Sequence, residues 1–390
     1  MRRLFPLLWA TALFAQPVRL IQNATFINDG KAAANVSVLV RDGKIAAIGK
    51  NIKAAKGAEV VDAKGKFLLP GFVSAHVHVI DGKEPRQLQL YARYGITTVW
   101  SLGGEKKAAF DLRAAQNTTA LDRARIYVSG DVITAKTPEE ARAKVTEVAA
   151  LRPDVIKIRV DDNLGSSTKM KPEVYNAVIE EAHKHRLPAA VHIFYLADAK
   201  DALRAGADII AHSVRDREID DEFIALMKRR NIPYIPTLTR EVSAFAYETT
   251  PDFFADPFFQ KEADPAVIAQ LQDPAKQEAM AKSMFARGYK RGLATAKINL
   301  KKAADAGLRI EMGTDSGAAP NRFEGYFEHL EMWMMAEAGL TPAQILRYAA
   351  RPIKTGDWAD LVLLGSNPLD DIRNTKTIES VWIAGNRIAP

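Results

Sequence analysis

The chain of 390 residues contains no cysteine. This absence excludes disulfide bonds, thiolate metal ligands and a cysteine nucleophile, so any bound metal must be held by histidine and oxygen ligands. Beyond its N-terminus the sequence lacks apolar runs long enough to span a membrane, and it lacks repeats of fixed period. The formal net charge is +7, but the basic residues neither cluster nor interleave with aromatic residues. We therefore expect neither a stable membrane anchor nor nucleic acid as a partner.

Residues 1–15 have the pattern of a secretory signal peptide. A basic start at Arg2 and Arg3 is followed by an apolar run over residues 4–14 and then by a small residue. The run is too short to cross a bilayer as a helix. The alternative, a buried N-terminal helix, is disfavoured by Pro6. We therefore predict export to the periplasm or the extracellular space.

Two regions at opposite ends of the chain have the pattern of short strands joined by tight turns. Residues 18–66 contain short alternating segments separated by Asp-Gly pairs, a frequent turn sequence of β-hairpins. Residues 351–390 return to the same pattern, with a turn at Gly385-Asn386. We predict that the two regions pair into one small β-sandwich domain.

Residues 67–350 alternate apolar strand candidates with amphipathic helical stretches. This alternation is typical of a parallel sheet with crossover helices. Eight strand–helix units favour an α/β fold of the closed (β/α)8 TIM-barrel type over a doubly wound sheet. The strand candidates are 67–73, 97–102, 126–129, 155–160, 189–194, 209–212, 234–237 and 309–313.

One connection, residues 239–291, is far longer than a usual loop and is rich in aromatic residues. It follows the seventh strand candidate, on the side where a barrel builds its substrate site. Two interpretations are open: a lid over the substrate, or a helical excursion that packs on the barrel wall.

Four histidines stand at predicted strand ends. His76 and His78 are two residues apart, so their side chains point to the same side of a strand and can hold one ion together. His192 and His212 end two further strand candidates. Neutral imidazole is a common ligand of zinc and similar metals. The remaining histidines, His183, His185 and His329, lie in helical stretches, where we expect solvated or structural roles.

Two further residues extend this pattern. Asp315 follows the last strand candidate between small residues, where a carboxylate can approach an ion closely and accept a proton from a water molecule. A helix N-cap is the alternative role for this aspartate. Lys157 stands in an apolar strand, where a buried ammonium group is costly, so it must be paired, neutralised or modified.

In these ordered motifs the sequence resembles the amidohydrolase superfamily, and within it the imidazolonepropionase-related amidohydrolases that include prolidase-like dipeptidases. The resemblance begins near residue 18 and covers almost all of the remaining chain. One departure concerns residues 351–357, where relatives usually carry a longer segment before the returning strands. This shortening affects the packing of the small domain and none of the expected ligands.

The resemblance implies a site with two divalent metal ions, usually zinc. Lys157 would be carboxylated to N6-carboxylysine and would bridge the two ions together with a hydroxide. A carbamate would also turn a misplaced cation into an oxygen ligand. The implied ligands are His76, His78 and Asp315 on one ion, and His192 and His212 on the other, with Lys157 between them.

The predicted reaction is hydrolysis of an amide C–N bond in a small substrate, such as a dipeptide or an N-acyl amino acid. The metals lower the pKa of water from about 15.7 towards 7, and Asp315 transfers the proton to the leaving amine. His212 or Tyr195 would assist the oxyanion. Arg322 either binds a substrate carboxylate or forms a structural ion pair.

Other functions remain compatible with the same residues. A cyclic amidase, a deaminase, or a lactone or organophosphate hydrolase would use the same site, because the fold does not choose among these reactions. A secreted binding protein without catalysis is the alternative from another class. The presence of the whole ligand set argues against that alternative. The sequence leaves open whether the chain forms a homo-oligomer.

Overall fold

The computed structural model describes residues 18–388. The predicted signal peptide of residues 1–15 therefore lies outside the described residues. In the described part of the chain, no helix is long and apolar enough to cross a membrane. The strands form one sheet of eight strands and two smaller parallel sheets, with helices around them.

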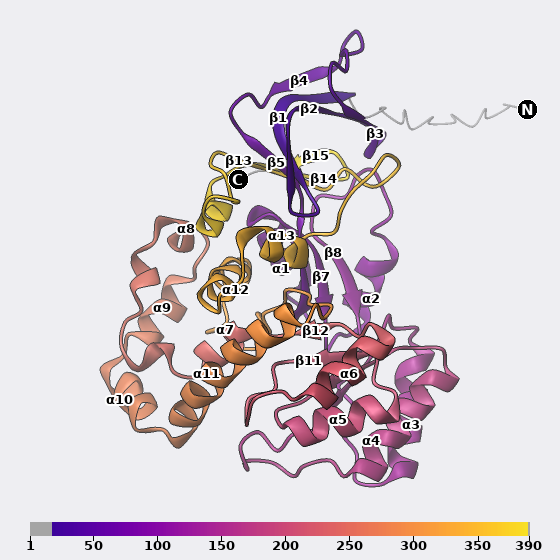
Figure 1. Ribbon diagram of the computed structural model, residues 1–390, viewed down its shortest axis with the longest axis vertical. Helices are drawn as coiled ribbons and strands as arrows, with labels where there is room; N and C mark the ends of the chain where they lie inside the picture. Colours follow the sequence, from indigo (N-terminus) through magenta and orange to yellow (C-terminus); the bar gives the residue numbers. More distant parts are fainter. Residues whose placement is uncertain (1–17, 389–390) are drawn as a thin grey trace, which may run out of the picture.

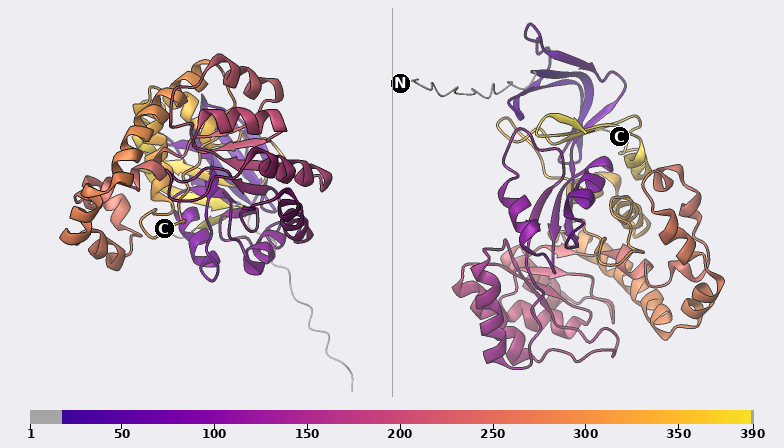
Figure 2. Two further views of the ribbon diagram at one scale, coloured as in Figure 1. Left: turned by 90° about the horizontal axis from the view of Figure 1, so that it is seen from below. Right: turned by 180° about the vertical axis from the view of Figure 1, so that it is seen from behind.

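Strands from both ends of the chain are joined in the eight-stranded sheet. β1 pairs with β2 and β5, and β5 pairs antiparallel with β13, so the two chain ends meet in the middle of this sheet. Figures 1 and 2 show it at one end of the molecule. Hydrogen bonds link all eight strands into one connected sheet, built from both chain ends as predicted for the small domain. The strands are β1 (Arg19–Asn28), β2 (Lys31–Arg41), β3 (Lys44–Gly49), β4 (Glu59–Asp62), β5 (Phe67–Pro70), β13 (Leu361–Leu364), β14 (Ile378–Ile383) and β15 (Asn386–Ile388).

The two smaller sheets contain only parallel pairs. Their strands are largely buried, as expected where helices cover a parallel sheet. One sheet has the order β6-β7-β8 and the other β12-β11-β10-β9. The strands are β6 (Phe72–Val77), β7 (Ile96–Ser101), β8 (Arg125–Val128), β9 (Ile156–Arg159), β10 (Ala189–His192), β11 (Ile209–Ala211) and β12 (Tyr234–Ile235).

Isolated parallel bridges connect these two sheets. Ile133, after β8, pairs with Ile158 of β9. Tyr234 of β12 pairs with Ile310, and Ser316 pairs with Val77 of β6. The parallel pairing therefore runs from β6 to β12 and returns through residues 310–316 to β6.

Two strand candidates differ from the observed elements. The first, 67–73, contains the end of one strand and the start of another, because β5 belongs to the eight-stranded sheet and β6 to a parallel sheet. The chain changes sheets at Gly71, where an added Cβ would lie 2.1 Å from the Thr97 hydroxyl oxygen. The last candidate, 309–313, is reduced to the single bridge at Ile310.

Helices follow most of the parallel strands. Several begin at side-chain caps, as at Thr137 before α3 and Asp220 before α6. The long helix α11 begins at Met284, within the 239–291 connection. The helices are α1 (Glu84–Arg93), α2 (Lys107–Ala114), α3 (Pro138–Ala150), α4 (Pro172–Lys184), α5 (Leu196–Ala205), α6 (Asp221–Arg230), α11 (Met284–Asp305), α12 (Tyr326–Glu337) and α13 (Pro342–Ala349).

The long connection over residues 239–291 folds mostly into short helices. Figures 1 and 2 show α9 and α10 on one flank of the molecule. Its aromatic residues pack against the segment that follows Asp315: Phe259 lies 4.8 Å from Phe323 and 5.1 Å from Tyr326 between ring centroids. The helices are α7 (Leu238–Val242), α8 (Pro257–Gln260), α9 (Pro265–Leu271) and α10 (Pro274–Lys282).

Candidate metal-dependent active site

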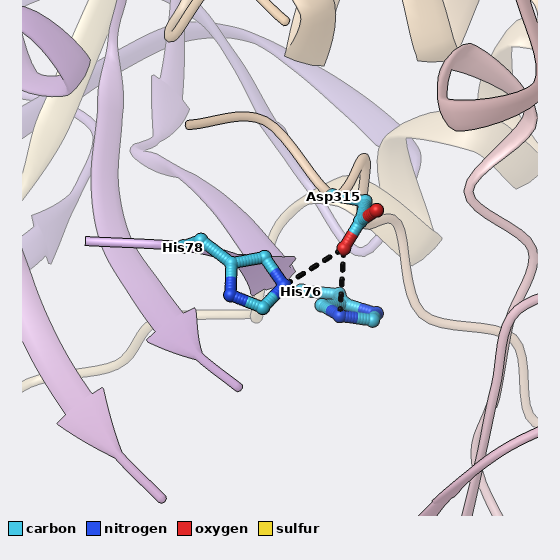
Figure 3. Close-up of side chains that lie close together, drawn as sticks. All are labelled: His76, His78 and Asp315. Atoms are coloured by element: carbon cyan, nitrogen blue, oxygen red, sulfur yellow. Dashed lines mark hydrogen bonds and ion pairs between the residues drawn. The ribbon is translucent and has the colours of Figure 1, made fainter. Parts of the chain in front are cut away.

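Two histidines and one aspartate form the most compact group of candidate ligands. His76 lies in β6 and His78 follows the end of that strand. Asp315 Oδ1 lies 3.2 Å from His76 Nε2 and 2.8 Å from His78 Nε2 (Figure 3). One ligand atom from each of the three residues lies within 4.8 Å of the others. The structure therefore brings these three predicted ligands together at distances that suit a metal ion.

The backbone holds Asp315 tightly against β6. The N–H groups of Thr314 and Asp315 both donate to the carbonyl oxygen of His76, at 2.9 and 2.8 Å. At Gly313 an added Cβ would lie 2.8 Å from the His76 nitrogen, so this position favours glycine. Asp315 itself has a φ of 64°, a left-handed conformation that aspartate adopts more readily than most residues.

The other predicted ligands adjoin this group. Lys157 Nζ lies 3.4 Å from His76 Nε2. The ring of His212 is 4.6 Å from that of His76 and 4.0 Å from that of His192, measured between centroids. The six predicted ligands thus form one continuous cluster, although they come from strands far apart in the sequence.

Hydrogen bonds to neighbouring groups fix the orientation of three imidazoles. His78 Nδ1 donates to the Gly103 carbonyl at 3.0 Å, His212 Nδ1 is hydrogen-bonded to Thr237 Oγ1 at 2.7 Å, and His192 Nε2 donates to Asp161 Oδ2 at 3.0 Å. In each ring the second nitrogen lies opposite the one that makes this hydrogen bond. Histidines that bind a metal ion usually have this arrangement. His76 differs, because its buried Nδ1 has no hydrogen-bond partner in the described part of the chain.

Burial keeps most of these imidazoles neutral. It lowers the pKa of His192 to about 4 and brings the pKa values of His76 and His212 well below their usual range. For His78 burial also lowers the pKa, but the hydrogen bond and charge of Asp315 outweigh it, so the net shift is upward. Neutral imidazoles and an ionised carboxylate are suitable donors for a zinc-like ion, so the residues present fit a metal.

Lys157 is buried without an acidic partner within ion-pair distance among residues 18–388, and its relative exposure is 2%. Burial lowers the pKa of its ammonium group to about 7, against the opposing charges of Asp315 and Glu105. The amine is therefore far easier to deprotonate than an exposed lysine, as the sequence argument requires.

The second oxygen of Asp315 faces a cluster of arginines. Arg322 Nη1 donates to Asp315 Oδ2, and Arg240 Nε lies 3.9 Å from the same oxygen. Burial raises the pKa of Asp315, but the charge of Arg322 and the hydrogen bonds from His76 and His78 outweigh it. Asp315 is therefore ionised, and Arg322 forms the ion pair that the sequence left as one of its two roles.

Tyr195 has a different environment from the predicted one. Its hydroxyl donates to Asp162 Oδ1 at 2.9 Å, and Lys169 lies over its ring at 4.8 Å. No contact joins Tyr195 to the six ligands within residues 18–388. The structure therefore gives no support to its assignment beside the oxyanion.

The three other histidines are structural or solvated, as expected. His183 pairs with Asp208 on the surface, and His185 lies near Glu181 at 3.8 Å. His329 is buried, with Nε2 hydrogen-bonded to the Tyr94 carbonyl at 2.8 Å.

Several residues near the site were missed by the sequence analysis. Asp161 comes two residues after β9, so its place at a strand end was a usable signal. Arg240 and Thr237 lie where β12 passes into α7, and Arg215 follows β11 by four residues. No spacing rule distinguishes these side chains from ordinary surface residues, because their contacts form only when distant segments of the chain come together in the fold.

Residues 67–351 match the model of the Amidohydrolase family. The chain belongs to the amidohydrolase family. This family combines a TIM barrel with a further domain, which agrees with an α/β fold of parallel sheets beside a separate sheet built from both chain ends. The membership confirms the resemblance to amidohydrolases, on which the ligand prediction rested.

Among solved structures, this amidohydrolase is similar to a Bifidobacterium longum protein assigned as a prolidase, with a TM-score of 0.78, 23% identity and coverage of 96% of this chain and 95% of the other. It is also similar to a Xaa-Pro dipeptidase with methionine in its active site, with a TM-score of 0.76, 20% identity and coverage of 96% and 100%. These similarities show a shared fold of prolidase-like type.

Among curated proteins, the chain is 27% identical over 201 residues to an enamidase of Eubacterium barkeri, covering 45% of this chain and 50% of the enamidase. It is 27% identical over 152 residues to a dihydroorotase of Bacillus cytotoxicus, covering 37% of this chain and 35% of the dihydroorotase. The chain thus matches half or less of the length of these relatives.

Proposed function

We propose that this chain is a metal-dependent amidohydrolase that cleaves the amide C–N bond of a small substrate, such as a dipeptide or an N-acyl amino acid. The observation that carries the proposal is the group of His76, His78 and Asp315, two of them buried and one partly buried, with ligand atoms within 4.8 Å. Family membership supports the reaction class, and the names of similar proteins, a dipeptidase and a dihydroorotase among them, support a C–N bond as the target.

We infer that the site holds two divalent ions, with zinc as the expected metal. The carbamate at Lys157 is supported by the buried position of this residue, the absence of an acidic partner within residues 18–388 and its pKa of about 7, because an uncharged amine can add carbon dioxide. The residues that would hold the ions are His76, His78 and Asp315 for one, His192 and His212 for the other, and carboxylated Lys157 between them.

When bound, such ions lower the pKa of water and polarise a scissile carbonyl. The chain's own residues then supply orientation and proton transfer. Arg322 holds Oδ2 of Asp315 and fixes the orientation of the carboxylate, which would accept a proton from the attacking water and return it to the leaving amine. His212, hydrogen-bonded to Thr237, is the proposed second group beside the reacting carbonyl.

Two further proposals concern architecture and location. The isolated bridges between β8 and β9 and from β12 back to β6 support a closed eight-stranded barrel that begins at β6 and ends near residue 350, flanked by a small domain from residues 18–70 and 351–388. The pattern of residues 1–15 supports export. Mass spectrometry of the protein from the cytoplasmic and periplasmic fractions tests export with cleavage near Gln16, and a chain that retains Met1 and is found only in the cytoplasm would contradict it.

The function is tested by removing metal with a chelator, restoring zinc, manganese or cobalt, and measuring turnover on a substrate panel. The panel contains dipeptides, N-acetyl amino acids, cyclic amides, amino-substituted bases, lactones and phosphotriesters. We expect metal-dependent hydrolysis of linear amides. His76→Ala should abolish it, and His183→Ala, at a surface histidine paired with Asp208, is the matched control.

Other outcomes identify the alternative functions. Preference for cyclic amides would indicate a cyclic amidase, ammonia release a deaminase, and turnover of only lactones or phosphotriesters a different hydrolase. Metal binding without turnover of any member would favour a non-catalytic binding protein. Linear-amide hydrolysis that persists in His76→Ala would contradict the proposed site.

A further inference from the structure

We propose that Glu331 is a positioning residue for His212, one of the expected ligands of the second metal ion. Glu331 caps helix α7 in place of Thr237, and this leaves the hydroxyl group of Thr237 to hold the imidazole of His212. The inference rests on the proposed function, because it concerns the same metal site. Within residues 18–388 Glu331 makes no hydrogen bond to the six expected ligands, so it acts through Thr237.

Thr237 lies between β12 and α7 and has an unusual backbone conformation. Its φ and ψ are both 50°, in the left-handed region. This region is unfavourable for a β-branched residue such as threonine. His212, whose Nδ1 lies 2.7 Å from Thr237 Oγ1, also has a positive φ, of 71°. The hydrogen bond therefore joins two residues with left-handed backbones, which the surrounding structure must hold in place.

Thr237 is the N-cap residue of α7, but its side chain does not cap the helix. A threonine in this position usually accepts a hydrogen bond from one of the first backbone N–H groups of the helix. Here Glu331 accepts such hydrogen bonds, because the N–H groups of Leu238 and Thr239 both donate to its carboxylate at 2.7 Å. The hydroxyl group of Thr239 also donates to it, at 2.8 Å. The Thr237 hydroxyl is therefore available to His212.

The surroundings of Glu331 make these hydrogen bonds important. Glu331 lies in α12, beside α7 (Figure 1), and is fully buried. Burial raises its pKa to about 7, and the hydrogen bonds from Leu238 and Thr239 oppose this shift. Within residues 18–388 no basic side chain lies within ion-pair distance of it. A carboxylate without a cation is costly to bury, and the hydrogen bonds from α7 offset that cost, so the contact fixes the start of α7 against α12.

Two other buried glutamates hold segments next to expected ligands, but in a different way. Glu328 accepts hydrogen bonds from the hydroxyl groups on either side of Asp315. Glu105 accepts one from the N–H of Gly103, whose carbonyl is hydrogen-bonded to an expected histidine ligand. Neither replaces a helix cap that a ligand-orienting side chain has given up. Glu331 is therefore the glutamate whose loss would draw a hydroxyl group away from an expected ligand.

Replacement of Glu331 by glutamine should reverse this division of contacts. Glutamine keeps the size of the side chain but presents one oxygen and one NH2 group, so at least one N–H group of α7 faces another donor. Thr237 is the residue that ordinarily caps such a helix, so we expect its hydroxyl group to turn towards α7. His212 then loses the contact that orients its ring.

The first measurement is zinc affinity, by titration of the metal-free protein with a competing chelator in the presence of bicarbonate. We expect Glu331→Gln to lower the affinity for the second ion by about 10–100-fold, as for other groups that orient metal ligands. Glu337→Gln is the matched control, because Glu337 ends the same helix, is 48% exposed and pairs with Lys297. Wild-type affinity in Glu331→Gln would overturn the inference.

A double-variant cycle separates positioning from a general loss of stability. If Glu331 acts through Thr237, Glu331→Gln has little further effect in a protein that already carries Thr237→Val. We expect the double variant to bind the second ion within about threefold of Thr237→Val alone. Losses that multiply in the double variant would show that the two residues act independently and would overturn the inference.

Crystal structures of metal-free wild type and Glu331→Gln follow the hydroxyl group directly. We expect Thr237 Oγ1 to leave His212 and to accept the N–H of Thr239 in the variant, and an unchanged contact with His212 would count against the inference. If Glu331→Gln does not fold, Glu331→Asp takes its place in the cycle. It keeps the charge but withdraws the carboxylate by one methylene group, so a smaller loss of affinity with the same dependence on Thr237 is expected.

The outcomes separate this inference from the proposed function. Multiplying losses in the cycle, or wild-type zinc affinity in both Glu331 variants, would overturn the inference and leave the proposed function standing. A wild-type protein that binds no zinc in the same titration would overturn the proposed function and the inference together.

Discussion

The candidate metal centre has two halves that differ in the charge that the chain supplies. In the first half, the carboxylate of Asp315 lies between the Nε2 atoms of His76 and His78. In the second half, the donors are His192, His212 and Lys157. Within the described chain, no carboxylate lies between these three donors. Asp161, the acidic neighbour of His192, is bound to its outer nitrogen.

This difference shows what the second half needs before it can hold a dication. Two neutral imidazoles beside an amine give no negative charge, and a protonated Lys157 would repel a metal ion. A carbamate at Lys157 would supply the missing anion. We therefore propose that the first half is complete in the folded chain and that the second depends on a modification of Lys157.

The largest expected effect comes from His76, which contacts both halves. It lies near Asp315 on one side and near Lys157 and His212 on the other. His76→Ala should lose metal from both halves. We expect kcat/KM to fall by about 10⁴-fold, because bound metal ions lower the activation barrier by several kcal/mol. His78→Ala should lose metal mainly from the first half. Equal metal contents in the two variants, measured by plasma mass spectrometry, would contradict this division.

Asp315→Asn tests proton transfer in the first half. The variant keeps the shape and one oxygen ligand but loses the basic carboxylate. We expect kcat to fall by about 10²–10⁴-fold with KM little changed, because the proton moves in the transition state. Steady-state kinetics alongside metal analysis checks this. A metal-loaded variant with kcat within about threefold of wild type would exclude Asp315 from proton transfer.

Lys157→Ala tests the anion on which the second half depends. Removing the proposed bridging anion should reduce kcat by about 10³-fold, equivalent to about 4 kcal/mol of barrier, and short carboxylic acids should restore part of the activity. Lys144→Ala, at a surface lysine paired with Glu140, is the matched control. Full activity of Lys157→Ala without added acid would disprove the bridging role.

The smallest effect is expected from the residues that orient the imidazoles of the second half. Asp161→Asn weakens the hydrogen bond to His192, and Thr237→Val removes the one to His212. Each change should lower metal affinity by about 10–100-fold, as for other groups that orient metal ligands. Metal titration with a competing chelator measures this. Wild-type affinity in both variants would show that these contacts do not orient the ligands.

The sequence predicted the parts of this centre that depend on local rules. Alternation along a strand placed His76 and His78 on one side, and strand-end positions indicated His192 and His212. The polarity of Lys157 in an apolar strand marked it as unusual. These signals need only the secondary structure around each residue.

The remaining parts depend on contacts between distant segments. The division of 67–73 between β5 and β6 follows from the pairing of β5 with β13, nearly 300 residues later in the chain. The contacts of Arg240 with Glu241, Tyr289 and Asp315 form only when the insertion and the strands have folded together. No local pattern distinguishes Arg240 from an exposed arginine.

The central claim, that the chain builds one complete and one lysine-dependent metal site, is tested most directly by metal content. Wild-type protein loaded with zinc in the presence of bicarbonate should contain about two equivalents per chain, and Lys157→Ala about one. Equal metal content in the two proteins would contradict the lysine-dependent half. A wild-type content near zero after loading would contradict the metal centre as a whole.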